Sequence, residues 1–116
     1  MLIKKIENVD KHAVNMKGIK NAFRQLPIGK ADNTPNFSFR VFTLEPGGHT
    51  PYHIHEWEHL NYFISGKGAI KDEEGQIHEV GPGDFSLLMP HEKHQYLNTS
   101  ESEDLVFICA VMKEYE

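Results

Sequence analysis

Apolar and polar positions alternate along much of the chain, in short runs separated by turn-forming residues. The clearest case is the segment 36–44, in which one face would carry Phe37, Phe39, Val41 and Thr43, and the other Ser38, Arg40, Phe42 and Leu44. A period of two residues is the pattern of a β-strand. Because both faces include apolar side chains, we expect this strand to lie in a fold with two layers.

Further runs rich in Val, Ile, Phe and Tyr have the length of strands. They cover residues 22–28, 60–65, 69–71, 77–80, 85–89, 95–97 and 105–112. Glycine and proline punctuate the spaces between the runs, for example in Pro46-Gly47-Gly48 and Gly81-Pro82-Gly83. No segment shows four turns of helical periodicity, and residues 10–16 are expected to hold a short turn at most. The pattern predicts an all-β sandwich or small barrel of antiparallel strands, as one domain over residues 1–116.

Charge and apolar composition narrow the partners of such a domain. The chain has 116 residues, with 12 Lys and Arg against 17 Asp and Glu, giving a formal net charge of −5. This balance disfavours nucleic acid or an anionic membrane as partner, because phosphate binding needs a basic surface. The longest apolar run, 106–112, is far shorter than the ~20 residues of a membrane helix. The amino-terminal residues are charged and lack an apolar segment typical of a signal peptide, so we expect a cytoplasmic protein.

Histidine is the unusual component of the sequence. Six of the eight histidines lie in two short windows: His49, His53, His55 and His59 in the first, His91 and His94 in the second. The single cysteine, Cys109, rules out an internal disulfide and a zinc site made of several thiolates. Any metal ion would therefore be held by histidine and carboxylate side chains.

The first histidine window allows two structures. On a strand, His53 and His55 would project from the same face, and His59 would begin the next strand after a tight turn at residues 56–58. A fourth ligand, His94, could then come from a later strand of the barrel.

Alternatively, residues 55–59 match the H-E-x-x-H motif of zinc proteases, in which two histidines share one helix face and the glutamate is a base. Such a site would use His55, Glu56 and His59 and would leave His53 without a role. The neighbouring Gly47, Gly48 and Pro51 disfavour the helix that this motif requires.

The spacing of these residues resembles the two motifs of the cupin family. The first motif, at residues 47–66, is matched by Gly47, His53, His55, His59 and Gly66, with His59 in the place where the family usually has glutamate. The second, at residues 83–98, is matched more loosely by Gly83, Pro90, His94 and Asn98. Here Glu92 stands in place of a glycine, and one residue is missing before His94. The chain is thus similar to a small, single-domain cupin of the conserved-barrel type in a four-histidine variant.

This resemblance implies a double-stranded β-helix, the cupin jelly-roll barrel, with one divalent metal ion in its mouth. The implied ligands are His53, His55, His59 and His94, and the implied ion is manganese or iron, although imidazole also suits zinc, nickel and copper. Four neutral ligands would leave the full charge of the dication and two open coordination positions. Homodimers are common in the family and are expected here.

These expectations lead to several functions. The first is a mononuclear metal enzyme of dioxygenase or oxygenase type that acts on a small chelating molecule. The others are a metal-dependent sugar or keto-acid isomerase, and a metal-binding or ligand-binding module without catalysis. A histidine-rich loop on a metal-free barrel is a further alternative.

Three more residues are candidates for the substrate pocket. In the segment 105–112, Phe107 and Cys109 share one face and would line the barrel interior if that face points inward. Arg40 could reach a substrate carboxylate, although arginine more often lies at the surface and Cys109 could simply pack as a small apolar residue. The pattern assigns no role to His49, His91, Glu56 or Glu58.

Overall fold

The structure, a computed structural model, describes residues 1–116, and its regular secondary structure consists almost entirely of strands. The strands are β1 (His12–Ala13), β2 (Lys20–Ile28), β3 (Phe37–His49), β4 (His59–Ser65), β5 (Gly68–Lys71), β6 (Ile77–Val80), β7 (Phe85–Leu88), β8 (Gln95–Asn98) and β9 (Leu105–Met112). Three single 3-10 turns, η1 (Ile6–Asn8), η2 (Lys30–Asp32) and η3 (Lys113–Tyr115), are the only helical elements. None of them has the length or apolar character needed to cross a bilayer.

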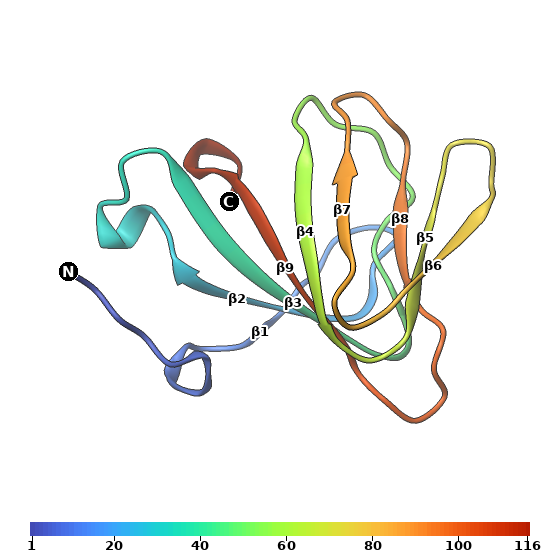
Figure 1. The fold of residues 1–116 in the computed structure, drawn as a ribbon, viewed down its shortest axis with the longest axis horizontal. Helices are drawn as coiled ribbons and strands as arrows, with labels where there is room; N and C mark the ends of the chain where they lie inside the picture. The colour runs from blue at the N-terminus through green and yellow to red at the C-terminus, as the bar shows by residue number, and fades with distance from the viewer.

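The strands form one antiparallel sheet that curls on itself. Its order is β6-β5-β8-β3-β9-β4-β7, with β2 paired to β3 and β1 to β2. In Figure 1, β4 and β7 stand on one side of the curled sheet, with β8, β5 and β6 on the other. The long strand β3 joins the two sides, because its first part pairs with β9 and its last residue, His49, pairs with Leu97 of β8. The all-β jelly-roll prediction is confirmed.

The two faces of β3 differ as the alternation predicts. Ser38, Arg40 and Leu44 are buried on the inner face, whereas Phe37 and Phe39 are exposed on the outer one. Val41 and Thr43 belong to the outer face but are also buried. The amino-terminal segment lies close to Val41. Gln25 of β2, which pairs with Val41, donates hydrogen bonds to the carbonyls of Ile6 and Val9 and so holds this segment there.

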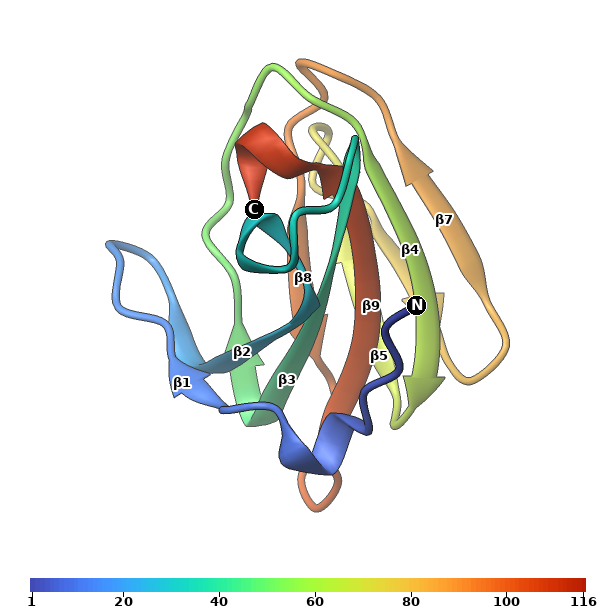
Figure 2. The ribbon, with the colours of Figure 1, turned by 90° about the vertical axis from the view of Figure 1, so that its left-hand side faces the viewer.

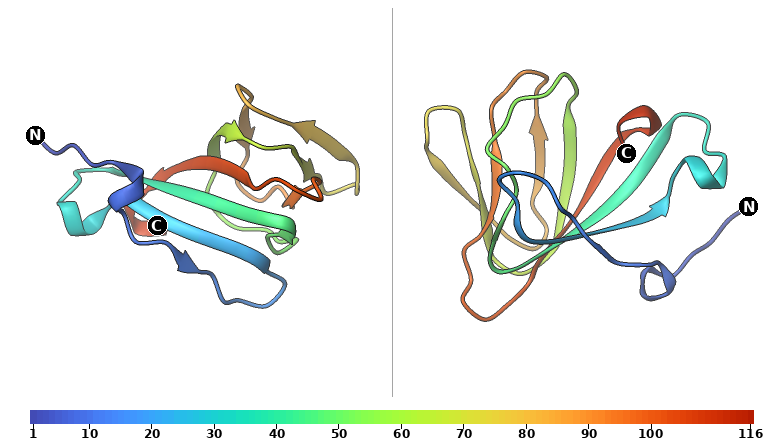
Figure 3. Two further views of the ribbon diagram at one scale, coloured as in Figure 1. Left: turned by 90° about the horizontal axis from the view of Figure 1, so that it is seen from below. Right: turned by 180° about the vertical axis from the view of Figure 1, so that it is seen from behind.

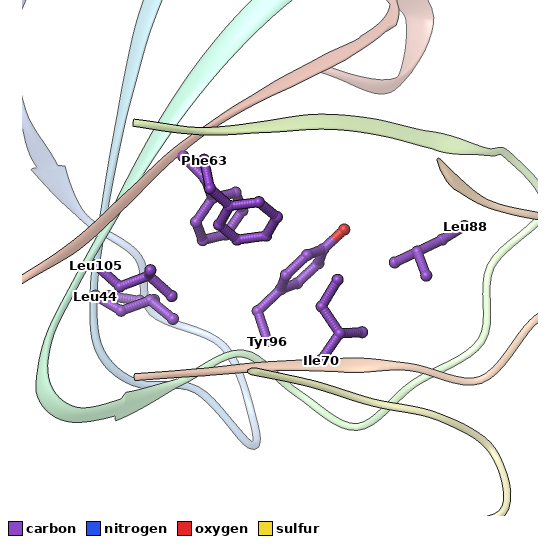
Figure 4. Packing of buried hydrophobic residues seen from close by; sticks show 8 residues of the cluster. Leu44, Phe63, Ile70, Leu88, Tyr96 and Leu105 are labelled. Carbon is purple, nitrogen blue, oxygen red and sulfur yellow. The ribbon is translucent and has the colours of Figure 1, made fainter. Parts of the chain in front are cut away.

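The hydrophobic core lies inside the curl. It comprises Ala22, Leu44, Phe63, Ile70, Leu88, Tyr96, Leu105 and Phe107. Tyr96 lies between Phe63 and Ile70, with Leu88 at the far end (Figure 4), and its ring stacks on Phe107 with 4.7 Å between centroids. The Tyr96 hydroxyl donates to the side-chain oxygen of Asn61 at 2.5 Å, so its polar end is satisfied although the ring is buried.

The predicted strands agree with the observed ones, with three corrections. Residues 12–13 pair with β2 as a short strand instead of forming only a turn. Pro46-Gly47-Gly48 lies within β3 instead of between strands, because an irregularity in the β2–β3 pairing and a φ of +76° at Gly47 let the chain continue. Residues 50–58 form a loop with a single bridge at His53, so His53 and His55 do not lie on a regular strand.

The carboxyl-terminal end folds back over one opening of the curled sheet. Figures 2 and 3 show it beside the turn η2, and the Glu116 carboxylate accepts hydrogen bonds from the Lys30 amide at 3.0 and 3.2 Å. The Ser38 hydroxyl also donates to Glu116. These contacts hold Tyr115 and Glu116 next to the inner face of β3.

Candidate metal centre

Backbone hydrogen bonds bring the two histidine windows together. His53 and His94 form an antiparallel bridge, with N–H to carbonyl distances of 3.1 and 3.0 Å. Two residues after His53, the carbonyl of His55 accepts a hydrogen bond from the His91 amide at 2.8 Å. The loop 50–58 is thereby fastened to the segment 91–94, although about 40 residues separate them in the sequence.

The side chains of these segments converge. The ligand atoms of His53, His55 and His94 all lie within 4.8 Å of one another. His59, the first residue of β4, lies beside them, with its Nε2 atom 2.5 Å from Nε2 of His55 and its ring 5.0 Å from that of His94. A cluster of three histidines compatible with one metal ion is therefore present, and His59 adjoins it.

The bonding of His94 fits a metal ion. Its Nδ1 atom lies 2.7 Å from the Glu92 carbonyl, which can only accept, so Nδ1 carries the proton and Nε2 presents a lone pair. That Nε2 atom is buried without any hydrogen-bond partner. An unsatisfied buried polar atom costs about 1–3 kcal/mol, and a metal ion among the three histidines would satisfy it.

Burial keeps these imidazoles neutral. It lowers the pKa of His53 and of His94 below the ordinary value, and charge repulsion from His94 adds to the effect at His53. The pKa of His55 falls to about 4, first through burial and then through repulsion from His94 and His53. The pKa of His59 falls to about 2, first through burial and then through the neighbouring Arg40. Neutral imidazole is the form that binds a metal ion.

Arg40 and Cys109 meet behind His59. They face each other in the β3–β9 register, and Nη2 of Arg40 donates to Sγ of Cys109 at 2.9 Å. Nδ1 of His59 lies 2.8 Å from the same sulfur and 3.5 Å from Nη2 of Arg40. Burial raises the pKa of the Cys109 thiol, which Arg40 only partly offsets, so the sulfur is neutral. Arg40 is thus an interior residue, because its position on β3 directs it into the curl.

A cavity of about 330 Å³ opens beside the histidines. All three pocket candidates, Arg40, Phe107 and Cys109, line it. Sequence reasoning missed Trp57 and Tyr115, which also line it and form a stack on His55 with 4.1 and 4.4 Å between successive ring centroids. No local signal marks Tyr115, because only the return of the chain after β9 brings it to the cavity.

The other candidates of the histidine windows lie away from the cavity. Glu56 and Glu58 are exposed, as is His91. His49 contacts the Thr50 carbonyl at 3.1 Å and Gln95 at 3.4 Å instead. The helical H-E-x-x-H alternative is wrong: residues 56–57 form a bend and β4 begins at residue 59, since this segment is drawn into the sheet.

The fold and this site define a class: a β-barrel that carries a histidine cluster beside a cavity. The chain belongs to the cupin family, since residues 40–111 match its Cupin domain. Gly66 of the first motif agrees with this, because it has a φ of +88° and a side chain there would clash with the Asp104 carbonyl.

Known proteins resemble the chain to different extents. The polyketide cyclase RemF from Streptomyces resistomycificus superimposes with a TM-score of 0.91 at 26% identity, over 97% of this chain and 80% of that one. Among curated proteins, the L-ectoine synthase of Hahella chejuensis is 34% identical over 54% of this chain and 48% of its own length. The L-ectoine synthase of Bordetella petrii is 41% identical over 50% of this chain and 44% of its own. The chain therefore spans about half the length of these curated relatives.

Proposed function

We propose that this protein is a mononuclear metal enzyme that closes a ring in a small organic molecule, with His53, His55, His59 and His94 as the metal ligands. The observation that carries the proposal is the convergence of four neutral imidazoles beside a cavity. Because none of these side chains is anionic, a bound divalent ion would keep its full charge. When bound, such an ion supplies Lewis-acid polarisation of a carbonyl oxygen.

The residues around the cluster have separate tasks in such a reaction. The Trp57 and Tyr115 rings, stacked on His55, cover the site and exclude water. Arg40 lines the same cavity, with its Nη2 atom 3.5 Å from Nδ1 of His59, and it places a positive charge beside the cluster. Phe107 and Phe42 stack with 5.5 Å between centroids and give the cavity an apolar wall.

The comparisons support ring closure as the reaction class. The polyketide cyclase RemF is named for ring closure, and it is similar over 97% of this chain at 26% identity. The oxygenase predicted from the family resemblance is the second candidate, because four ligands would leave two positions open on an octahedral ion of manganese or iron. An isomerase or a binding module without catalysis has no specific observation in its favour.

The metal requirement distinguishes the two reaction classes. The protein would be loaded separately with zinc, manganese and iron and incubated with a panel of acyclic oxo acids and amido acids. Mass spectrometry would follow loss of water, and an electrode would follow oxygen. Turnover with redox-inert zinc under nitrogen is expected. Activity that requires iron or manganese together with oxygen consumption would overturn ring closure in favour of the oxygenase.

We also propose that two copies of the chain associate through the outer face of strands β3, β9, β4 and β7. Large apolar side chains are exposed there: Phe37, Phe39, Leu60, Phe85, Leu87 and Met112. The strand register places them on one continuous surface, since Leu60 faces Leu87 directly and Tyr62 faces Phe85. Apolar surface of this extent on a small protein is typical of an interface.

A further inference from the structure

Arg40 is a buried cation without an anionic partner. Its relative exposure is 7%, and the only ion pairs in the structure, Lys4–Asp32 and His78–Asp72, lie elsewhere. Its contacts are the neutral Cys109 sulfur, His59 and the face of the Phe42 ring, 5.1 Å from its guanidinium carbon. A buried charge is normally paired, because the low-dielectric interior strongly disfavours an isolated one.

Two hydrogen-bond donors of the cavity lining also lack an acceptor. They are Nε of Arg40 and Nε1 of Trp57, both buried and both without a partner. Arginine and tryptophan side chains can only donate in these positions. Two residues of the cavity lining therefore carry N–H groups that have no acceptor within the protein.

The remaining charges of the cavity do not neutralise Arg40. Arg24, exposed on β2, adds a second positive charge to the lining. The one side-chain carboxylate of the lining, that of Glu116, accepts hydrogen bonds from the Lys30 amide and the Ser38 hydroxyl and forms no ion pair with Arg40. The lining therefore carries two cationic side chains against one anionic one, although the chain has a formal net charge of −5.

We infer that the molecule bound in this cavity is an organic acid whose anionic oxygens pair with Arg40, while its planar or apolar body lies among Phe42, Phe107 and Trp57. The volume of about 330 Å³ is at the lower end for ligand sites, so the acid is small. The anion site adds a substrate class to the proposed function, because an acid held by Arg40 lies next to the histidine cluster. Binding of the acid by itself requires only the unpaired Arg40 and the cavity.

The test uses Trp57, the only tryptophan of the chain, as a fluorescent reporter inside the site. Benzoate and the neutral benzyl alcohol would be titrated into zinc-treated and metal-free protein in a carboxylate-free buffer. Benzoate is expected to change the fluorescence with saturation, and benzyl alcohol to bind at least about tenfold more weakly. The substitution Arg40→Met should weaken benzoate binding about tenfold or more, whereas Lys67→Met, a control at an exposed cation outside the cavity, should change it far less.

Two results would overturn the inference: equal affinity for benzoate and benzyl alcohol in the wild-type protein, or unchanged benzoate affinity in Arg40→Met. If circular dichroism shows that Arg40→Met does not fold, Arg40→Lys replaces it, since lysine keeps the charge but not the planar fork and should bind benzoate with intermediate affinity. The metal proposal fails separately: benzoate binding through Arg40 in a protein that takes up no zinc would refute the metal enzyme and leave the anion site standing.

Discussion

Removing the His94 imidazole is expected to abolish most of the stabilisation that a metal ion gives to this protein. His94 is 1% exposed, its Nδ1 is held by the Glu92 carbonyl, and its Nε2 has no partner other than the ion we propose. The perturbation is His94→Ala, with His78→Ala as control. His78 is exposed, bonds Asp72 and lies outside the cluster.

The magnitude follows from linkage between binding and folding. An ion present at 100 times its dissociation constant stabilises the folded state by about 2.7 kcal/mol. For a domain of this size that is a rise of roughly 10 °C in Tm. Loss of one ligand should weaken binding by about 100-fold, at least as much as loss of a residue that only supports a ligand. The same metal concentration would then stabilise the variant by about 0.4 kcal/mol, or roughly 2 °C.

Differential scanning calorimetry would measure Tm with and without zinc for both variants and the wild type. The difference between the two scans isolates metal binding from the stability change that the smaller side chain causes by itself. The control His78→Ala should keep the full rise. A rise in His94→Ala equal to that of the wild type would refute the metal site, because the variant lacks one of the four proposed ligands.

Three further predictions concern pH, backbone conformation and association. The metal-free protein should lose stability as the pH falls below 6.5, because histidines of the unfolded chain bind protons there while the buried histidines of the folded chain, such as His55 with a pKa of about 4, do not. Each such histidine lowers the free energy of unfolding by up to about 1.4 kcal/mol per pH unit, and a free energy of unfolding in urea that stays constant from pH 6.5 to 4 would contradict this prediction. His91 has a φ of +68°, so His91→Val should lower the free energy of unfolding by about 1–2 kcal/mol while His91→Gly should not, as thermal denaturation would show. Light scattering should show a dimer for the wild type and a monomer for Leu87→Glu, whereas Ile77→Glu, at a similarly exposed position on β6, should leave the dimer intact. A monomeric wild-type protein would refute the interface.

Much of the fold could be read from local pattern. Richness in Val, Ile and Phe predicted β9 at residues 105–112 and β6 at residues 77–80 with the observed bounds, because the preference of these side chains for strands acts locally. The motif spacing likewise selected His53, His55 and His94, which the structure brings together. The loop 50–58 escaped prediction, because its shape depends on hydrogen bonds to residues 91 and 94 that no local pattern records.

What the sequence by itself determined is therefore the strand content, the family and the identity of the clustered histidines. Tertiary structure alone decided the chemistry around them. Arg40 and Cys109 are 69 residues apart and meet only because β3 and β9 pair in one register. Tyr115 reaches Trp57 only because the chain turns back after β9. Long-range pairing of strands is set by closure of the whole sheet and burial of its inner face, so the surroundings of the metal cluster follow from the complete fold and not from any one segment.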